Sequence, residues 1–368
     1  VMKTGLYIHL PFCKQKCNYC DFASFAGREK FIPAYLAALE KEAALSSVKT
    51  FDTLYVGGGT PSLLGADELR RLCQLIKRHF GPISAFAEST LEANPESLTP
   101  EKIAVLRQAG FNRLSLGLQS FHDDELRTLG RVHNVNAFLN AYHAAREGGF
   151  ENINVDLIAG LPGQRLESFL DGLLRLAELR PEHISVYGLQ IEEGTPFFER
   201  GIVCDQLLMR RMLEETHKRL LARGYHHYEI SNFALPGREA LHNTHYWDNG
   251  DYVGLGSAAA SYLHGVRKQN TPDLQEYIRR MQEGKDPSVF SESLTGKAHE
   301  GETLMLGLRK LDGLELTPKQ EAFFGREIQK HVSNGLLERD GKKVKLSFEG
   351  MFLANEVFCS FVEPFDDL

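Results

Sequence analysis

The sequence predicts an α/β fold, an incomplete (β/α)6 TIM-type barrel followed by a mainly α, winged-helix-like C-terminal domain. Two observations predict the barrel. Six short segments with the pattern of β-strands recur in the first part of the chain, and stretches with helical hydrophobic spacing lie between them. Strands that alternate with helices form a parallel sheet with the helices outside. Seventh and eighth units do not show, so we expect the barrel to stay open.

The individual elements follow from hydrophobic periodicity. The residues of segment 6–10 alternate as in a strand, whereas Ile32, Tyr35, Leu36 and Leu39 recur at helical spacing. Both patterns continue along the chain. The expected strands are 6–10, 53–56, 88–93, 113–118, 152–158 and 183–189, and the expected helices include 31–45, 67–79, 136–146 and 166–179.

The pattern changes twice after the barrel, which predicts three parts: 1–235, a connecting segment 236–293 made of Gly- and aromatic-rich loops, and a C-terminal helical domain 294–368. Within 328–361 the order helix, hairpin, helix is typical of a winged helix, with the hairpin turning at Asp340-Gly341. Lys342, Lys343 and Lys345 are confined to the hairpin. We therefore expect a capping domain rather than a DNA-binding one.

Composition excludes several classes of function. The net charge is −7 and there is no basic block, so nucleic acid is not expected as a partner. No run of eighteen apolar residues and no charged-then-apolar leader are found, which predicts a cytoplasmic protein. Cys73, Cys204 and Cys359 are scattered, as reduced core cysteines of a cytosolic chain usually are.

Three other cysteines, Cys13, Cys17 and Cys20, follow the first strand with the spacing C-x3-C-x2-C. Thiolates are the soft ligands that iron–sulfur clusters require, and three of them leave one iron of a 4Fe-4S cluster open to a chelating molecule. The alternatives are a structural zinc site and unligated cysteines. Zinc normally takes four ligands in paired C-x2-C knuckles, and no second knuckle exists here. The loop therefore predicts a 4Fe-4S cluster.

Polar or glycine residues also follow the other predicted strands. Because loops converge at the carboxyl ends of parallel strands, we expect these residues to form one pocket. Alternatives stay open: the glycines could form a plain tight turn, and Glu92 could be a solvated edge charge, whereas Asp156 lies in an apolar run and needs a partner. The residues concerned are Gly57-Gly58-Gly59-Thr60-Pro61, Glu92, Asn94, Gln119, Asp156 and Gln190.

The cysteine motif resembles the signature of the radical S-adenosylmethionine (radical SAM) enzymes. The flanking residues 6–13 and Cys20-Asp21-Phe22 are similar, more narrowly, to the coproporphyrinogen-oxidase-like branch, and the similarity covers about residues 5–360. The resemblance implies that SAM chelates the open iron, that the reduced cluster cleaves it, and that a 5′-deoxyadenosyl radical can form. It also implies the SAM-contacting residues Tyr7, Tyr19, Gly58, Gly59, Thr60, Glu92, Gln119, Arg131, Asp156 and Gln190.

Two departures argue against oxidase activity. The oxygen-independent coproporphyrinogen oxidases carry a further cysteine where this chain has Phe22, and a long amino-terminal extension before the position of Tyr7. Instead, the segment 242–247 is similar to the H-N-x-x-Y-W motif of the haem chaperones in this branch. The resemblance makes His242, His245, Tyr246 and Trp247 candidate haem-binding residues, since imidazole ligates haem iron and aromatic faces pack on porphyrins. The alternative is that the histidines hydrogen-bond a loop and the aromatics fill an inter-domain core.

The resemblance therefore predicts a haem-binding radical-SAM-type protein that delivers haem to acceptor haemoproteins. An electron donor such as a flavodoxin or ferredoxin would be a further partner, and a homodimer is left open. The other functions that the sequence leaves open are an oxygen-independent coproporphyrinogen III oxidase, a two-SAM radical methylase, and a redox or structural iron–sulfur protein that never cleaves SAM.

Overall fold

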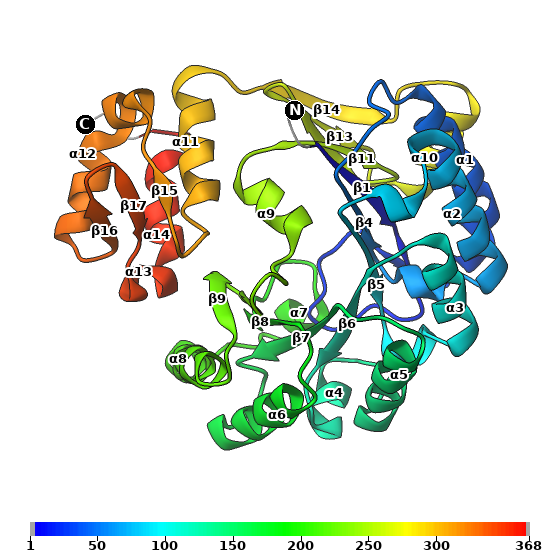
Figure 1. Ribbon diagram of the computed structural model, residues 1–368, viewed down its shortest axis with the longest axis horizontal. Helices are drawn as coiled ribbons and strands as arrows, with labels where there is room; N and C mark the ends of the chain where they lie inside the picture. Colours follow the sequence, from blue (N-terminus) through cyan, green and yellow to red (C-terminus); the bar gives the residue numbers. More distant parts are fainter. Residues whose placement is uncertain (1–3, 366–368) are drawn as a thin grey trace.

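The computed structural model describes residues 4–365, which form a mixed α/β fold around a 12-stranded sheet. The six predicted strands are present, lie side by side in chain order and run parallel (Figure 1). They are β1 (Thr4–Leu10), β4 (Thr53–Gly58), β5 (Glu88–Ala93), β6 (Arg113–Gln119), β7 (Ile153–Ala159) and β8 (His183–Gly188). Within residues 4–365, no helix combines the length and apolar character needed to cross a membrane.

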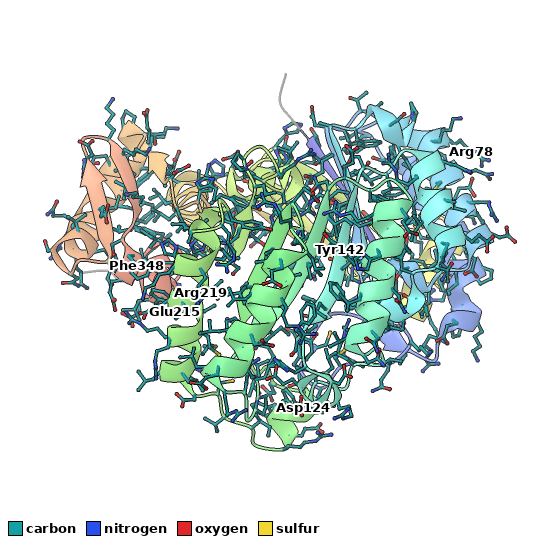
Figure 2. All side chains as sticks on the ribbon, turned by 60° about the horizontal axis from the view of Figure 1, so that its bottom comes forward. Arg78, Asp124, Tyr142, Glu215, Arg219 and Phe348 are labelled. Carbon is teal, nitrogen blue, oxygen red and sulfur yellow. The ribbon has the colours of Figure 1, made fainter. Side chains whose placement is uncertain are left out.

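Helices cover the outer side of these strands (Figure 1). Alternate strand residues such as Leu6, Ile8 and Leu10 point to this side and are fully buried in the main core. Tyr142, labelled in Figure 2, donates a hydrogen bond of 2.9 Å from its hydroxyl to the carbonyl oxygen of Leu179, which joins two neighbouring helices. The helices are α1 (Ile32–Leu45), α2 (Ala66–Phe80), α3 (Pro100–Ala109), α4 (Asp123–Thr128), α5 (Val135–Glu147), α6 (Leu166–Glu178) and α8 (Gln206–Leu221). The short helix α7 (Pro196–Glu199) lies instead against the cysteine loop, where the Phe197 N–H donates to the Asn18 carbonyl at 2.9 Å.

The inner side of the strands is polar, because the other alternate residues of the same strands point to it. These side chains satisfy one another. His183 Nδ1 lies 2.6 Å from Asn154 Oδ1, and the Ser185 hydroxyl donates to the same oxygen at 3.0 Å. Arg113, 2% exposed, lies among them and donates to the Thr90 hydroxyl at 3.4 Å.

The connecting segment differs from the expected loops. Strand β11 pairs in parallel with β1, and antiparallel strands extend the sheet beyond it. The H-N-x-x-Y-W residues form a short helix. The pairing was not visible in the sequence because the partner of β11 lies some 250 residues earlier in the chain. Before this segment, β9 (His226–Glu229) and β10 (Asn232–Ala234) extend the sheet beyond β8. The elements of the segment are α9 (Leu241–Trp247), β11 (Asp251–Leu255), β12 (Ala260–Leu263), β13 (Val266–Asn270), α10 (Leu274–Gln282) and β14 (Ser288–Ser293).

Residues beyond 293 build a second core of their own. The predicted hairpin is present as β16 and β17, and the expected last helix is split into two. This part lies against α8, as Phe348 beside Glu215 and Arg219 shows in Figure 2. The elements are α11 (Gly296–Gly307), β15 (Leu314–Glu315), α12 (Pro318–Ser333), β16 (Leu337–Asp340), β17 (Lys343–Leu346), α13 (Phe348–Phe352) and α14 (Ala354–Phe358).

Helix α9 is fixed to the sheet by one carboxylate. Glu88, at the start of β5 and only 4% exposed, accepts hydrogen bonds from the backbone N–H groups of Leu241 and His242 at 2.9 and 3.0 Å. A carboxylate at a helix N-terminus satisfies donors that have no partner within the helix. Glu88 therefore positions the segment that carries the aromatic motif.

We expect Glu88→Ala to lower the free energy of unfolding by about 3 kcal/mol, because a buried and a partly buried N–H group lose a charged acceptor. Urea unfolding followed by the fluorescence of Trp247, the only tryptophan, measures the change where α9 ends. Glu101→Ala, on the exposed start of α3, is the matched control. Equal unfolding midpoints for the two variants would contradict the role given to Glu88.

Candidate functional site

The cysteine loop leaves β1 through the short strand β2 (Phe12–Cys13), which pairs with β3 (Phe25–Ala26). Its middle is tied to the segment that follows α4. The Asn18 backbone N–H donates to the Leu129 carbonyl at 2.9 Å, and the Gln15 side chain donates to the Gly130 carbonyl at 3.0 Å. These contacts hold the loop at the carboxyl ends of the strands.

The three loop thiols are free and partly buried. Burial raises the pKa of the Cys13 and Cys20 thiols, and the proximity of the other loop sulfurs raises it further, while the Thr60 hydroxyl acts in the opposite direction on Cys13. Deprotonating Cys13 and Cys20 is therefore costly. A metal that binds thiolates offsets that cost.

Arg131 places a positive charge beside the loop. Its Nη1 donates to Cys17 Sγ at 3.6 Å, and its Nη2 donates to Asn94 Oδ1 at 2.7 Å and to the Gly117 carbonyl at 2.8 Å. Both Nη2 acceptors are neutral, and the nearby Glu96 carboxylate acts on the guanidinium through its charge. A cluster with three thiolate ligands carries net negative charge, and the soft donors and the adjacent cation fit a 4Fe-4S cluster.

The glycine segment at the end of β4 is shaped by its neighbours. Gly58 has φ +112°, and a Cβ there would lie 2.6 Å from the His9 ring, so only glycine fits. The Gly58 N–H donates to Glu92 Oε2 at 3.1 Å, and the Tyr55 hydroxyl donates to Glu92 Oε1 at 2.7 Å. The segment is a tight turn, and it also brings its backbone to Glu92.

Glu92 and Asp156 lie on the inner side of the sheet. Desolvation raises the pKa of Glu92 to about 7, and the charge of Asp156 contributes in the same direction. Burial also raises the pKa of Asp156. The partner expected for Asp156 is Asn154, which donates to Oδ1 at 2.8 Å, and the Ser115 hydroxyl lies 3.5 Å from Oδ2.

A cavity of about 610 Å³ opens between the loop, the inner side of the sheet and the C-terminal part. Five predicted site residues line it: Tyr7, Gly58, Glu92, Tyr246 and Trp247. Its remaining wall includes Asp21, Phe22, His9, Asn249, Tyr252, Arg267, Gln269, Glu302 and Leu306. The cavity thus joins the residues that follow the cysteines to the aromatic end of α9.

The histidines of α9 are engaged in hydrogen bonds within the protein. His242 is 1% exposed, and its Nδ1 and Nε2 lie 2.8 Å from the hydroxyls of Thr53 and Tyr246. Burial lowers the pKa of His242 to about 3. His245 Nε2 donates to the Asp251 carbonyl at 2.6 Å. These contacts match the alternative reading for the histidines, whereas the two aromatic residues line the cavity.

The other predicted residues lie around the cysteine loop or apart from it. The Thr60 hydroxyl donates to Cys13 Sγ at 3.5 Å, and the Gly59 N–H donates to the Leu10 carbonyl at 2.8 Å. Gln119 ends β6 with φ +73°. Tyr19 packs on a small apolar cluster that includes Leu129, Leu189 and Phe197. Gln190 is exposed and lines no part of the cavity.

Several residues at the site were not predicted as site residues. Asn94 was noticed only as a polar residue at a strand end, yet it bridges Arg131 and Thr60. Tyr252, Arg267 and Glu302 line the cavity from β11, β13 and α11. No local pattern distinguishes these three from surface residues, because their neighbours at the site come from distant parts of the chain.

The chain is similar to several known proteins. Residues 7–176 match the model of the radical SAM superfamily. The haem chaperone HemW of Bacillus subtilis is 37% identical, over 97% of this chain and 98% of its own length, and that of Escherichia coli is 38% identical over 69% of each. The structure of coproporphyrinogen III oxidase (HemN) from Escherichia coli, a radical SAM enzyme, superposes with a TM-score of 0.87 at 26% identity, covering 98% of this chain and 90% of that one.

Both the superfamily signature and a near full-length relative are therefore present. The identity to HemW proteins extends through the six parallel strands, α9 and the residues beyond 293, since it covers nearly all of this chain. The chain belongs to the radical SAM superfamily and, within it, to the HemW family.

Proposed function

We propose that this protein binds haem and delivers it to acceptor haemoproteins, as a radical-SAM-type haem chaperone that carries a 4Fe-4S cluster and SAM. The observation that carries the proposal is the shared cavity. Tyr246 and Trp247 of the H-N-x-x-Y-W segment face the same space as Tyr7, Gly58 and Glu92. Membership of the HemW family supports this function.

Cys13, Cys17 and Cys20 would hold the 4Fe-4S cluster. A bound cluster would offer SAM an iron without a cysteine ligand and one electron. The residues around the cluster would bind and orient SAM. Glu92 accepts hydrogen bonds on the cavity wall and is suited to a ribose hydroxyl or an amine. The other predicted SAM-contacting residues stay in the proposal, although Gln190 is exposed and does not line the cavity.

Haem contact is assigned to Tyr246 and Trp247. The Arg309 guanidinium lies over the ring of Trp247, 4.3 Å from the ring centroid. His242 then acts indirectly, because its Nε2 fixes the Tyr246 hydroxyl. His245 supports the turn after α9 through the Asp251 carbonyl.

The finer description of the fold belongs to the same proposal. The six parallel strands would form an incomplete (β/α)6 barrel, and the helix–hairpin–helix part a winged-helix-like cap. The division at 235 and 293 and a cytoplasmic location remain predictions from the sequence. An electron donor as a partner and a homodimer also remain predictions from the sequence.

A second candidate function, coproporphyrinogen oxidation, is favoured by the similarity to HemN. Anaerobic incubation of the reconstituted, reduced protein with SAM and coproporphyrinogen separates the two. We expect no decarboxylated product, together with tight haem binding. Product formed in step with 5′-deoxyadenosine would identify an oxidase instead.

The pKa of Glu92 predicts how SAM binding depends on pH. The ionised carboxylate is the better acceptor for a cationic ligand, and a pKa of about 7 leaves it mostly protonated at pH 6. We expect SAM affinity to rise roughly tenfold from pH 6 to pH 8 and then to level off. Anaerobic calorimetric titration measures this rise. It should disappear in Glu92→Gln, and an unchanged slope in that variant would contradict the role of Glu92.

Trp247→Ala should weaken haem binding about tenfold, because an aromatic face on the cavity wall is lost. Soret absorbance during haem titration measures the affinity, and Trp247→Phe, which keeps an aromatic ring, should largely restore it.

His242→Gln should lower the melting temperature more than it lowers haem affinity. Abolished binding in a folded His242→Gln, with unaffected Trp247→Ala, would make His242 the haem ligand and contradict the assignment.

A further inference from the structure

We infer that Asn94, at the end of β5, is a positioning residue that directs hydrogen bonds onto the cluster sulfurs and thereby sets the reduction potential of the cluster. The inference rests on the proposed 4Fe-4S cluster. Asn94 acts on Cys13 and Cys17 indirectly. It hydrogen-bonds to Thr60 and Arg131, and these two residues donate to the two sulfurs.

The first step concerns the orientation of the Asn94 amide. Arg131 Nη2 lies 2.7 Å from one end of the amide. A guanidinium only donates hydrogen bonds, so the atom facing it must be the carbonyl oxygen Oδ1. The amide nitrogen Nδ2 therefore faces the opposite way, towards Thr60. The chemistry of the partner, rather than the shape of the side chain, fixes this assignment.

The second step concerns the direction of the Thr60 hydrogen bond. Asn94 Nδ2 lies 3.1 Å from Thr60 Oγ1, and an amide N–H₂ group only donates. The Thr60 hydroxyl must accept there, which leaves its own proton free. That proton points to Cys13 Sγ, 3.5 Å away. The positive charge of Arg131 thus fixes, through Asn94, a donor on Cys13, while Nη1 of the same guanidinium serves Cys17.

Asn94 is itself held rigidly. Its backbone N–H donates to Ser62 Oγ at 3.0 Å, the Ser62 and Ser97 hydroxyls are 2.6 Å apart, and Ser97 Oγ donates to the Asn94 carbonyl at 3.1 Å. A Cβ at Gly117 would lie 3.0 Å from Arg131 Nη2 and 3.1 Å from Asn94 Oδ1. Glycine at that position therefore permits the contact between Arg131 and Asn94.

The consequence is electrostatic. One-electron reduction, for example by dithionite, makes the cluster one charge more negative. Hydrogen bonds to the sulfurs and a nearby cation stabilise that charge and raise the reduction potential. Asn94→Asp keeps the size of the side chain but removes the Nδ2 donor. The Thr60 hydroxyl then turns to the carboxylate, and Cys13 loses the hydrogen bond from Thr60 while that from Ser24 stays.

The test is an anaerobic potentiometric titration of the reconstituted full-length protein, with the reduced cluster followed by electron paramagnetic resonance. We expect Asn94→Asp and Thr60→Val each to lower the reduction potential by ~59 mV. For a one-electron couple this shift is a tenfold change in the ratio of oxidised to reduced cluster. Thr60→Ser, which keeps the hydroxyl, should retain the wild-type potential. Asn112→Asp, the same change at the opposite end of these strands, is the matched control.

The double variant Thr60→Val/Asn94→Asp separates a relay from a simple charge effect. In a relay, Asn94→Asp shifts the potential less when Thr60→Val has already removed the hydroxyl. An equal shift in both backgrounds, or wild-type potentials in Thr60→Val, would overturn the inference. Iron and sulfide contents are measured first: protein without a cluster would defeat the proposed cofactor, whereas a full cluster with unshifted potentials would defeat the relay alone.

Discussion

The site depends on one electrostatic arrangement, the Arg131 guanidinium beside the sulfurs of the cysteine loop. Its neutral acceptors, Asn94 and the Gly117 carbonyl, come from the ends of β5 and β6. The charge of Glu96 acts on this cation, and three thiolates on the proposed cluster would give it a further negative partner. The loop, the strand ends and the segment after α4 therefore converge on the same charge.

The two sides of the parallel strands divide stability from function. The outer residues are apolar and pack under the helices, whereas the inner residues are polar and satisfy one another. At the amino-terminal ends of the strands this network is closed by α9, through Glu88 and Thr53. The remaining open space lies towards the carboxyl ends, where the cavity meets the cysteine loop.

Much of this could be predicted from the sequence because the signals are local. Hydrophobic periodicity predicted the six strands, and the spacing of Cys13, Cys17 and Cys20 predicted a loop that binds a metal cluster. The features that the sequence did not predict depend on contacts between distant parts of the chain. Strand β11 pairs with β1 across most of the chain, and Arg267 and Glu302 join the cavity from separate elements. The expected loop at 242–247 is a helix because Glu88, some 150 residues earlier, satisfies its first N–H groups.

That helix changes how the H-N-x-x-Y-W segment is understood. In a loop the four residues could face one ligand together, but on α9 His242 and Tyr246 are one turn apart and bond to each other. The histidine faces Thr53 and the ring of Tyr55, so its nitrogens are used inside the sheet. Only the carboxyl end of the helix reaches the cavity. The motif thus combines an inner anchor, His242, with an outer aromatic surface, and the spacing of the motif follows from the helical turn between them.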